Sequence, residues 1–570
     1  HYGGMLDDFE SRFTDPVTHE IEYLHPFSAH ARISDYDNPT TQDIARLPDG
    51  EEKQRWFDAM DLEIKQLWDK GTFRPIDRSE VPEGAQILDS TWVFKRKRHP
   101  DGLLDKLKAR CCLRGDQQIH ENEREDIYAP VVDWASLRLL LTLSLQFDWC
   151  TRQIDFKNAF VQAELPSPIY MRVPQGYTRK PDLMGKVLIV FKSLYGDRRA
   201  PRMWYMHMLK ILNEMGFHAS AKDNCLFLHP GKHVVFVLYV DDGIFFAKEP
   251  AIIEELLKTF TEKSLDFTVE GDLTNYLGIK VTRTEGRIHL SQSGLIKRIM
   301  DLVGVHDDTN PVATPANAPL GRDLDHPEHN QDRFSYRSAI GMINFLVQNT
   351  RPDMMFACHQ AARFSNNPRS SHTNAVVRMG KYLKGTHDKG LIIDTSTSLR
   401  LDCYCDADFA GLWKAEPPED PSCTRSRSGY VIVLGGQPVY WSSKLQTETA
   451  LSTLESEYVC LSQSTRTLMC LRETLAEITS TMGLHVPENE RPSTLFEDNA
   501  ATVLIANSFP NRLSPRSKTL AVKYHWFKNW IREGIIKVVH IPTSEQLADI
   551  FTKALTKDKF EANRLGLMGW

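Results

Sequence analysis

The sequence lacks the features that mark membrane-spanning or secreted proteins. No apolar run reaches the roughly 18 residues that a transmembrane helix needs, so we expect no membrane partner. The first residues, HYGGMLDDFE, have no basic segment followed by an apolar one, which argues against a secretory signal. They also lack an initiator Met, so we expect a processed or excised chain. Internal repeats and long low-complexity tracts are absent as well.

Cysteine never occurs in a metal-binding pattern. Among the ten cysteines, the closest sets are Cys111-Cys112 and Cys403-x-Cys405, with no CxxC pair and no zinc-ligand spacing. This argues against a zinc site and favours reduced, mostly structural thiols. Such thiols fit a reducing, intracellular setting.

The composition is that of a globular protein with several domains. Hydrophobic residues make up 41%, charged residues 25% and aromatic residues 10%, which argues against disorder. The 570 residues predict roughly three or four domains. The net charge of 69 − 75 = −6 does not suggest nucleic-acid binding, but two segments are basic. Residues 92–114 carry 8 Lys/Arg and 2 acids, and residues 511–537 carry 7 and 1. Each is either a phosphate-binding surface or a solvated basic face.

Apolar spacing predicts alternating helices and strands along the chain. Residues 1–48 are acidic and show little regular spacing of apolar residues, so we expect a loosely ordered leader. Residues 49–71 have the three-or-four spacing of an amphipathic helix, and residues 90–115 predict a basic hairpin. We further predict helices over 134–147, 251–263, 336–350 and 370–386, a strand running into a helix over 149–160, a loop over 305–335, and a separate unit of strands and helices over 399–570.

Two acids interrupt an apolar stretch, VVFVLYVDDGIFFA, at residues 234–247. An Asp-Gly pair between apolar runs is a hairpin signal, so Asp241 and Asp242 could simply form a turn. However, two carboxylates at the end of a buried strand repel each other unless a cation offsets them. Two-metal nucleotidyl transfer needs such acids from separate segments. Asp155, flanked by apolar residues in QIDFKNAF, is a suitable third ligand.

Several further motifs stand in a recognisable order around these acids. They are STWVFKRKRHPDGLLDKLKARCCLRG, IDFKNAFVQAELPSPIYMRVPQGY, FKSLYGDRRAPRMWY, YVDD and NYLGIKVTRTEGRIHLSQSGLIKRIM. With them the chain resembles, from about residue 50 to its end, the reverse transcriptase–ribonuclease H of copia-type (Pseudoviridae) LTR retrotransposons. One motif departs from the family, since LYGDRRAPR stands where LYGLKQAPR is usual. That difference puts details of template contact in doubt, but not the chemistry.

The resemblance implies a right-hand polymerase in which Asp155, Asp241 and Asp242 bind two catalytic metal ions. It implies that Phe160 blocks the 2′-OH of the incoming sugar, although an aromatic residue there could also be core. The remaining residues that it implies are Lys108, Arg110, Phe156, Tyr195 and Gly196 for the nucleotide, Tyr239, Tyr276, Leu277 and Gly278 for the primer, and Lys95 and Lys97 for nucleic acid.

A second set of acids lies beyond residue 399. Read singly, Ser452-x-x-Glu455 is a helix capping box, and Asp498 and Asp549 could stabilise helix or turn starts. Together, CDADFAG, STLESEY, FEDNAA and EQLADIFTKAL resemble the four ribonuclease H motifs of the same family. This implies that Asp406, Glu455, Asp498 and Asp549 bind two metal ions, with Glu457 as the alternative to Glu455. It also implies that Arg516, Lys518 and Lys523 contact nucleic acid, and that residues 412–428 form a long exposed loop.

We therefore predict a multidomain α+β and α/β fold: fingers, palm and thumb, followed by a ribonuclease H-like mixed sheet. The expected function is RNA- and DNA-dependent DNA synthesis with cleavage of RNA in RNA/DNA hybrids. The resemblance implies Mg²⁺ in both sites, with Mn²⁺ as a substitute. It implies an RNA template, a DNA primer, dNTPs, a tRNA-derived primer and a homodimer on substrate as partners, and cytoplasmic virus-like particles or the nucleus as the location. The predicted domains are a leader (1–48), N-terminal helix and fingers (49–150), palm with an interleaved fingers segment and primer-grip hairpin (151–290), thumb with or without a short connection (291–393), linker (394–398) and ribonuclease H (399–570).

Two rival hypotheses stay open at this point. A domesticated, catalytically silent nucleic-acid-binding protein would be free to lose its metal ligands, yet all seven predicted carboxylates are present. A narrower alternative keeps the polymerase active and the ribonuclease H inactive. We find no Asp-Thr/Ser-Gly protease motif and no zinc-binding integrase pattern.

Overall fold

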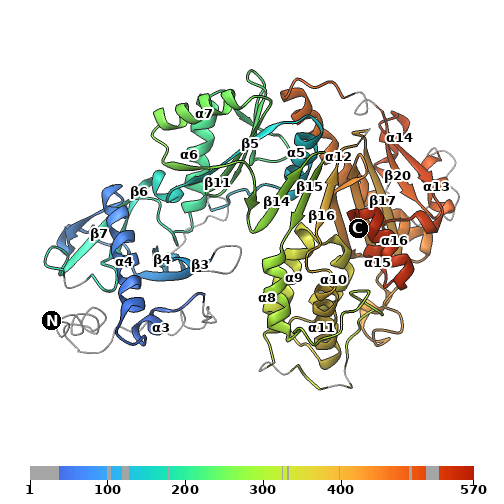
Figure 1. The fold of residues 1–570 in the computed structure, drawn as a ribbon, viewed down its shortest axis with the longest axis horizontal. Coiled ribbons are helices and arrows are strands. Elements are labelled where there is room, and N and C mark those ends of the chain that lie inside the picture. The colour runs from blue at the N-terminus through green and yellow to red at the C-terminus, as the bar shows by residue number, and fades with distance from the viewer. Residues whose placement is uncertain are drawn as a thin grey trace.

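The computed structural model describes residues 37–98, 104–118, 127–177, 180–323, 325, 327–329, 333–396, 398–486, 491–508 and 525–570. Strands in these residues form several sheets, and helices pack on them. This mixed α/β architecture in successive units confirms the predicted fold class (Figure 1). No helix in the described part of the chain combines the length and apolar character that crossing a bilayer requires.

The fingers region begins with helices that the sequence predicted only in part. Helix α4 (Glu51–Asp69) buries Trp56, Met60 and Leu67, which confirms the predicted amphipathic helix. Within the leader predicted to be loosely ordered, α3 (Thr41–Ala45) is a capped helix whose Ile44 joins the same apolar core. The strands are β1 (Phe73–Asp77), β2 (Ile87–Leu88), β3 (Ser90–Arg98), β4 (Leu104–Leu113), β6 (Glu164–Arg172) and β7 (Lys186–Lys192), of which β3 and β4 form the predicted two-stranded hairpin.

The palm is a six-stranded sheet in the order β12-β5-β11-β10-β9-β8. Its two central strands are buried on both faces, which is why their sequence is apolar without alternation. Phe245 and Ala247 face the core under α6 and α7, whereas Ile244 and Phe246 face the core that contains α5. The bounds are α5 (Trp134–Gln146), β5 (Cys150–Phe156), α6 (Ala200–Glu214), β8 (His218–Ala219), β9 (Leu226–His229), β10 (Val234–Tyr239), β11 (Asp242–Ala247), α7 (Pro250–Glu262) and β12 (Phe267–Gly271).

The prediction of a helix directly after β5 is wrong. The chain makes only a single 3₁₀ turn there, η3 (Ala159–Gln162). Asn158 precedes it with a left-handed φ of 50°, and Ala163 returns to an extended conformation. The left-handed residue and the immediate entry into β6 leave no room for an α-helical turn.

Beyond the palm, a four-stranded sheet in the order β13-β14-β15-β16 carries the thumb helices. Strand β16 (Leu391–Asp394) pairs with β15, so the predicted linker 394–398 begins inside a strand. The other elements are β13 (Asn275–Tyr276), β14 (Ile279–Thr284), β15 (Arg287–Ser291), α8 (Ser293–Val303), α9 (Tyr336–Asn349), α10 (Met355–Ala362) and α11 (Ser370–Lys384).

The last unit is built on a mixed five-stranded sheet in the order β19-β18-β17-β20-β21. The first three strands are antiparallel, and β20 and β21 run parallel to β17, as predicted for a ribonuclease H-like sheet. Its elements are β17 (Leu401–Asp408), β18 (Arg427–Leu434), β19 (Gln437–Leu445), α12 (Thr453–Thr481), β20 (Ser493–Glu497), α13 (Ala500–Asn507), α14 (Lys528–Arg532), β21 (Ile536–His540), α15 (Asp549–Thr552) and α16 (Lys557–Met568).

The prediction of an exposed loop over residues 412–428 is wrong for the middle of that segment. Glu416 is 4% exposed, and its carboxylate accepts hydrogen bonds from the backbone N–H of Arg322 at 2.6 Å and from the Arg363 guanidinium. Asp420 adds an ion pair to Arg322 at 2.8 Å. The segment therefore docks on the thumb, because its acids find basic partners that are distant in sequence.

One apolar core runs from α5 through the thumb helices into the five-stranded sheet. Buried Arg138 of α5 donates to the Val439 carbonyl oxygen at 2.9 Å, and its guanidinium lies 3.9 Å from the centroid of the Trp441 ring. Figure 1 shows the fingers at one end of the molecule and the thumb and five-stranded sheet at the other, with the palm between them.

Candidate active sites

The β10–β11 turn is held by the palm around it. Tyr239 pairs with Asp242, so the two loop residues are Val240 and Asp241. Val240 has a φ of 53°, which is strained for a β-branched residue. The Trp204 indole donates to the Val240 carbonyl, and the Phe156 N–H donates to the Asp241 carbonyl at 2.7 Å. These bonds fix the two acids relative to β5.

Strand register brings the third predicted acid beside the turn. Asp242 is directly opposite Asp155 in the antiparallel β11–β5 pair. The next residue must be glycine, because a Cβ on Gly243 would lie 2.7 Å from the Phe236 ring and 2.9 Å from Ile154. The three predicted polymerase acids therefore lie together. Their carboxylate oxygens do not all lie within 4.8 Å of one another. One other group of acids in the described residues does meet that distance.

Burial and the negative charge of neighbouring acids raise the pKa values of Asp242 and Asp155. Burial, and then the charges of Asp241, Asp155 and Glu270, raise the pKa of Asp242 to about 7. Burial and Asp241 also raise the pKa of Asp155, whereas Lys97 and Lys108 lower it. Glu270, on β12, is an acid of this site that sequence reasoning missed. A single acid in the stretch FTVEG carries no signal of its own.

The basic hairpin faces these acids. Register places Lys95 opposite Lys108, Lys97 opposite Lys106 and Val93 opposite Arg110, so all five basic side chains share one face. The sequence left open whether Lys108 or Arg110 faces the site, and both do. Burial, and then the charges of Arg110 and Lys97, lower the pKa of Lys108 to about 8. The hairpin therefore supplies concentrated positive charge opposite the carboxylates.

Tyr195 and Phe160 continue this surface into the palm. The Arg110 guanidinium lies 5.0 Å from the centroid of the Tyr195 ring, and the Tyr195 and Phe160 rings are 4.8 Å apart. Burial raises the pKa of Tyr195 to about 12. Gly196 has a φ of 91°, and a Cβ there would lie 2.0 Å from the Leu113 carbonyl oxygen. The predicted residues Phe160, Tyr195 and Gly196 thus lie together beside Arg110.

Two predicted contact residues are buried instead. Phe156 is 1% exposed and packs against Trp204 in the palm core, so its side chain cannot touch a nucleotide. Tyr276 is 2% exposed and packs against Trp134, whereas the turn residues of its hairpin, Leu277 and Gly278, are half-buried and exposed, respectively. The motifs alone do not show which strand residues point into the core, so the burial of these two rings was not predicted from the sequence. Tyr239 is half-buried beside the acids.

In the five-stranded unit, Asp406 of β17, Glu457 of α12 and Asp498 after β20 bring their carboxylate oxygens within 4.8 Å of one another. The prediction of Glu455 for this cluster is wrong. Its carboxylate accepts the Leu451 N–H at 2.8 Å and so points back to the start of the helix. Residues two positions apart lie on nearly opposite faces of a helix. With Glu455 pointing back to the start of the helix, Glu457 points toward the sheet.

Burial and mutual repulsion dominate the electrostatics of this cluster. Burial raises the pKa of Asp406 to about 7, and burial and neighbouring acids raise the pKa values of Glu457 and Glu497 well above their usual range. Glu497 is fully buried beside the cluster, and sequence reasoning missed it because it reads as an ordinary strand residue. Glu457 Oε2 is buried and has no hydrogen-bond partner among the residues that the structure describes.

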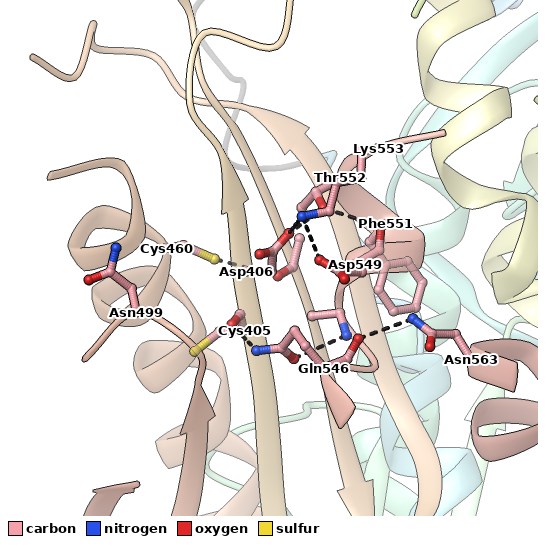
Figure 2. A network of polar contacts seen from close by, with 12 residues as sticks. Cys405, Asp406, Cys460, Asn499, Gln546, Asp549, Phe551, Thr552, Lys553 and Asn563 are labelled. Carbon is pink, nitrogen blue, oxygen red and sulfur yellow. Dashed lines mark hydrogen bonds and ion pairs between the residues drawn. The ribbon is translucent and has the colours of Figure 1, made fainter. Parts of the chain in front are cut away.

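Asp549 lies next to this cluster but is neutralised by lysines. Lys553 Nζ is 2.6 Å from Asp549 Oδ1 and 3.6 Å from Asp406 Oδ2, and Lys559 also pairs with Asp549. Thr552 donates its hydroxyl to Asp406. Figure 2 shows Asp406, Asp549, Thr552 and Lys553 pointing toward one another. Asp549 is thus near Asp406 but outside the three-carboxylate group.

The donor set of the three-carboxylate group fits a divalent cation. Carboxylate oxygens are the ligands that Mg²⁺ prefers in proteins. A buried carboxylate oxygen without a partner, such as Glu457 Oε2, also calls for a positive charge. The predicted nucleic-acid contacts Arg516, Lys518 and Lys523 lie outside the described residues.

Comparison with known proteins gives consistent matches. Residues 75–318 match the family described as "Reverse transcriptase (RNA-dependent DNA polymerase)". The Retrovirus-related Pol polyprotein from transposon RE1 of Arabidopsis thaliana is 31% identical over 523 residues, covering 90% of this chain and 34% of that protein. The polyprotein from transposon TNT 1-94 of Nicotiana tabacum is 30% identical over 551 residues, covering 94% and 39%. The chain thus spans little more than a third of the length of these relatives.

Among solved structures, the foamy viral protease-reverse transcriptase in complex with dsDNA is similar over 94% of this chain and 97% of that one. The sequence identity is 13% and the TM-score is 0.43. A likeness of this degree carries no argument about function.

Proposed function

The chain belongs to the reverse transcriptase family of copia-type LTR retrotransposons, and we propose that it is an RNA- and DNA-dependent DNA polymerase with ribonuclease H activity. Its proposed partners are an RNA template, a DNA primer with a tRNA-derived first primer, dNTPs and the RNA/DNA hybrid. We extend the proposal to a homodimer on substrate and to action in cytoplasmic virus-like particles or the nucleus.

One observation carries the polymerase proposal. The turn that bears Asp241 and Asp242 is fixed opposite Asp155 by strand register and by the Phe156 N–H. A strained turn with repelling carboxylates is costly for stability alone, which supports a functional reason for it. The basic face of the β3–β4 hairpin lies opposite, where a triphosphate would need positive charge.

Asp155, Asp241 and Asp242 would hold Mg²⁺, or Mn²⁺ as a substitute. When bound, the two metal ions would lower the pKa of the primer 3′-OH and neutralise the leaving pyrophosphate. The protein's own contribution is positioning. Trp204 and Phe156 hold the turn, and Lys108 and Arg110 attract the triphosphate. Phe160, braced against Tyr195, would exclude a ribose 2′-OH.

The ribonuclease H proposal rests on the three-carboxylate group. Asp406, Glu457 and Asp498 would hold Mg²⁺, which supplies a nucleophilic water for attack on an RNA phosphodiester. Asp549 and Lys553 lie beside Asp406 and would orient its carboxylate. A second metal ion at Asp549 is part of the proposal, and it would require Asp549 to exchange a lysine partner for the ion.

The test of the polymerase is extension of a labelled DNA primer on a labelled RNA template with Mg²⁺. We expect extension by the wild-type chain and none by Asp241→Asn. As a matched control, Glu262→Gln removes an exposed acid at the end of α7 and should extend normally. Template binding without extension by the wild-type chain would refute the polymerase and favour a silent binding protein.

The same reaction tests the ribonuclease H, because the RNA strand carries its own label. We expect the wild-type chain to shorten the RNA as the primer grows. Extension with intact RNA would refute the ribonuclease H proposal and leave a polymerase alone. Asp498→Asn should separate the activities by stopping cleavage while extension continues, because Asp498 belongs to the second carboxylate group.

A further inference from the structure

Helix α4 contains a buried acid that the proposed mechanism does not use. Glu63 is 4% exposed, although it sits on a helix whose other acids face solvent. It lies ahead of the segment 75–318 that matches the family. Burying a carboxylate costs free energy unless hydrogen bonds and opposite charges compensate it. The partners of Glu63 therefore indicate what it is for.

The backbone partner of Glu63 is the free edge of the basic hairpin. Strands β3 and β4 form a two-stranded sheet, so no third strand in the described residues pairs with the N–H groups on the outer edge of β4. Glu63 Oε1 accepts the Cys111 N–H at 3.3 Å, and the Tyr195 carbonyl accepts the next outward N–H, that of Leu113, at 2.7 Å. Glu63 and Tyr195 thus occupy adjacent positions along one strand edge.

The charged partners of Glu63 are the two cations proposed to bind the triphosphate. Lys108 and Arg110 precede Cys111 on β4, and the charges of both lower the pKa of Glu63 against the upward effect of burial. Arg110 Nε is itself buried and has no hydrogen-bond partner within the described part of the chain. Its guanidinium lies over the Tyr195 ring, which meets Phe160. Glu63 is thus the negative charge behind this row of side chains.

The same helix also reaches the palm next to the catalytic acids. Lys70, which ends α4, donates to the Lys157 carbonyl at 3.0 Å and pairs with Asp266 at 2.9 Å. Asn158 donates to Gln66 of α4 at 3.2 Å. Residues 157 and 158 follow Asp155 by two and three positions. Helix α4 therefore spans from the hairpin edge to the loop after the palm strand.

We infer that Glu63 is a positioning residue of the nucleotide site, which holds Lys108 and Arg110 toward the incoming triphosphate. The inference rests on the proposed polymerase function. Glu63 itself would not touch the nucleotide, because it is buried at the strand edge while Lys108 and Arg110 are only half-buried. Its charge offsets the repulsion between the two neighbouring cations and keeps both in place before the triphosphate arrives.

The test compares two neutral isosteres on the same helix. Glu63→Gln keeps an oxygen for the Cys111 N–H but removes the charge. The control is Glu52→Gln, which removes another α4 acid that pairs with the same hairpin through Arg96, on the opposite face from Lys108. Steady-state primer extension on an RNA template gives KM for dNTP and kcat, and a binding assay gives Kd for the primer–template.

For Glu63→Gln we expect KM for dNTP to rise about fivefold or more, with kcat and primer–template Kd within about twofold. Glu52→Gln should leave KM for dNTP unchanged. Glu63→Asp, which keeps the charge, should restore most of the affinity. An unchanged or lower KM in Glu63→Gln overturns the inference, and so does an equal rise in Glu52→Gln.

The thermal melting of each variant separates positioning from folding. We expect Glu63→Gln to melt no lower than the wild type, because an amide is cheaper to bury than a carboxylate. A variant that unfolds and loses kcat together would show a structural role and overturn the inference. A wild-type chain that extends no primer would instead refute the proposed function.

Discussion

Two glutamates of one helix should respond in opposite ways to the same change. Glu457 belongs to the three-carboxylate group, whereas the Glu455 carboxylate accepts the Leu451 N–H just ahead of α12. The variants Glu457→Gln and Glu455→Gln each exchange a carboxylate for an amide of the same shape. They lie two positions apart in one helix, so the change in intrinsic helix propensity is the same in both variants.

The magnitude follows from the cost of charging the cluster. Asp406, 2% exposed, has its pKa raised from 3.8 to about 7. At about 1.4 kcal/mol per pKa unit, ionising it in the metal-free fold costs on the order of 4 kcal/mol at pH 8. Glu457 adds to this cost, because burial and the charges of Glu497, Asp406 and Asp498 raise its own pKa, and the amide removes that contribution. We therefore expect metal-free Glu457→Gln to be more stable than the wild type by on the order of 1–3 kcal/mol at pH 8.

The same substitution removes one of the three proposed metal ligands, so hybrid cleavage should fall by about 100-fold or more. Glu455→Gln should cleave normally and keep its stability within about 0.5 kcal/mol, because the glutamine side-chain oxygen can still accept the Leu451 N–H. The assays are urea unfolding without divalent ions and cleavage of a labelled RNA/DNA hybrid with Mg²⁺. Normal cleavage by Glu457→Gln, or loss of cleavage in Glu455→Gln, would refute the reasoning.

Three further outcomes are expected. Phe160→Val should admit ribonucleotides, because a smaller side chain beside Tyr195 leaves room for a 2′-OH, and unchanged discrimination in primer extension would contradict the steric role. Gly243→Ala should destabilise the palm by about 1–3 kcal/mol and stop extension but not hybrid cleavage, because its Cβ would lie 2.7 Å from the Phe236 ring. The pKa values of Asp242 and Asp406 are raised to about 7 in the fold, so protonation of these carboxyls stabilises the metal-free fold. This stabilisation is fully present below about pH 4 and is lost as the pH rises through about 7. The Tm of the metal-free fold should therefore fall between about pH 5 and 8 and recover with Mg²⁺, whereas an Asp242→Asn/Asp406→Asn variant should show a flatter profile.

Much of the architecture was predictable because its signals are local. The period of α4, the Asp-Gly signal after β10 and the alternation in the basic hairpin each lie within about 25 residues. Side-chain facing was harder to predict. Glu455 and Glu457 lie in the same motif. The capping signal at Ser452 does not decide which of the two belongs to the three-carboxylate group. Only packing of α12 on the sheet decides which one faces Asp406.

What the sequence could not predict depends on partners that are distant along the chain. Residues 412–428 are rich in Pro and acids and predict an exposed loop, yet Glu416 is buried because Arg363 reaches it from the thumb. Glu63 likewise reads as one acid of an ordinary amphipathic helix. Its burial has a reason only once Cys111 and Arg110 lie beside it.

The buried acids therefore separate by what compensates them. Glu416 and Asp353 are paired with Arg363 and Arg351 within the chain, so their charge serves the fold. Glu457 has a buried oxygen with no partner in the described residues. A fold that buries such a group bears its cost in the absence of a cation. That imbalance supports a cation as the missing partner of Glu457, as the proposed ribonuclease H site requires.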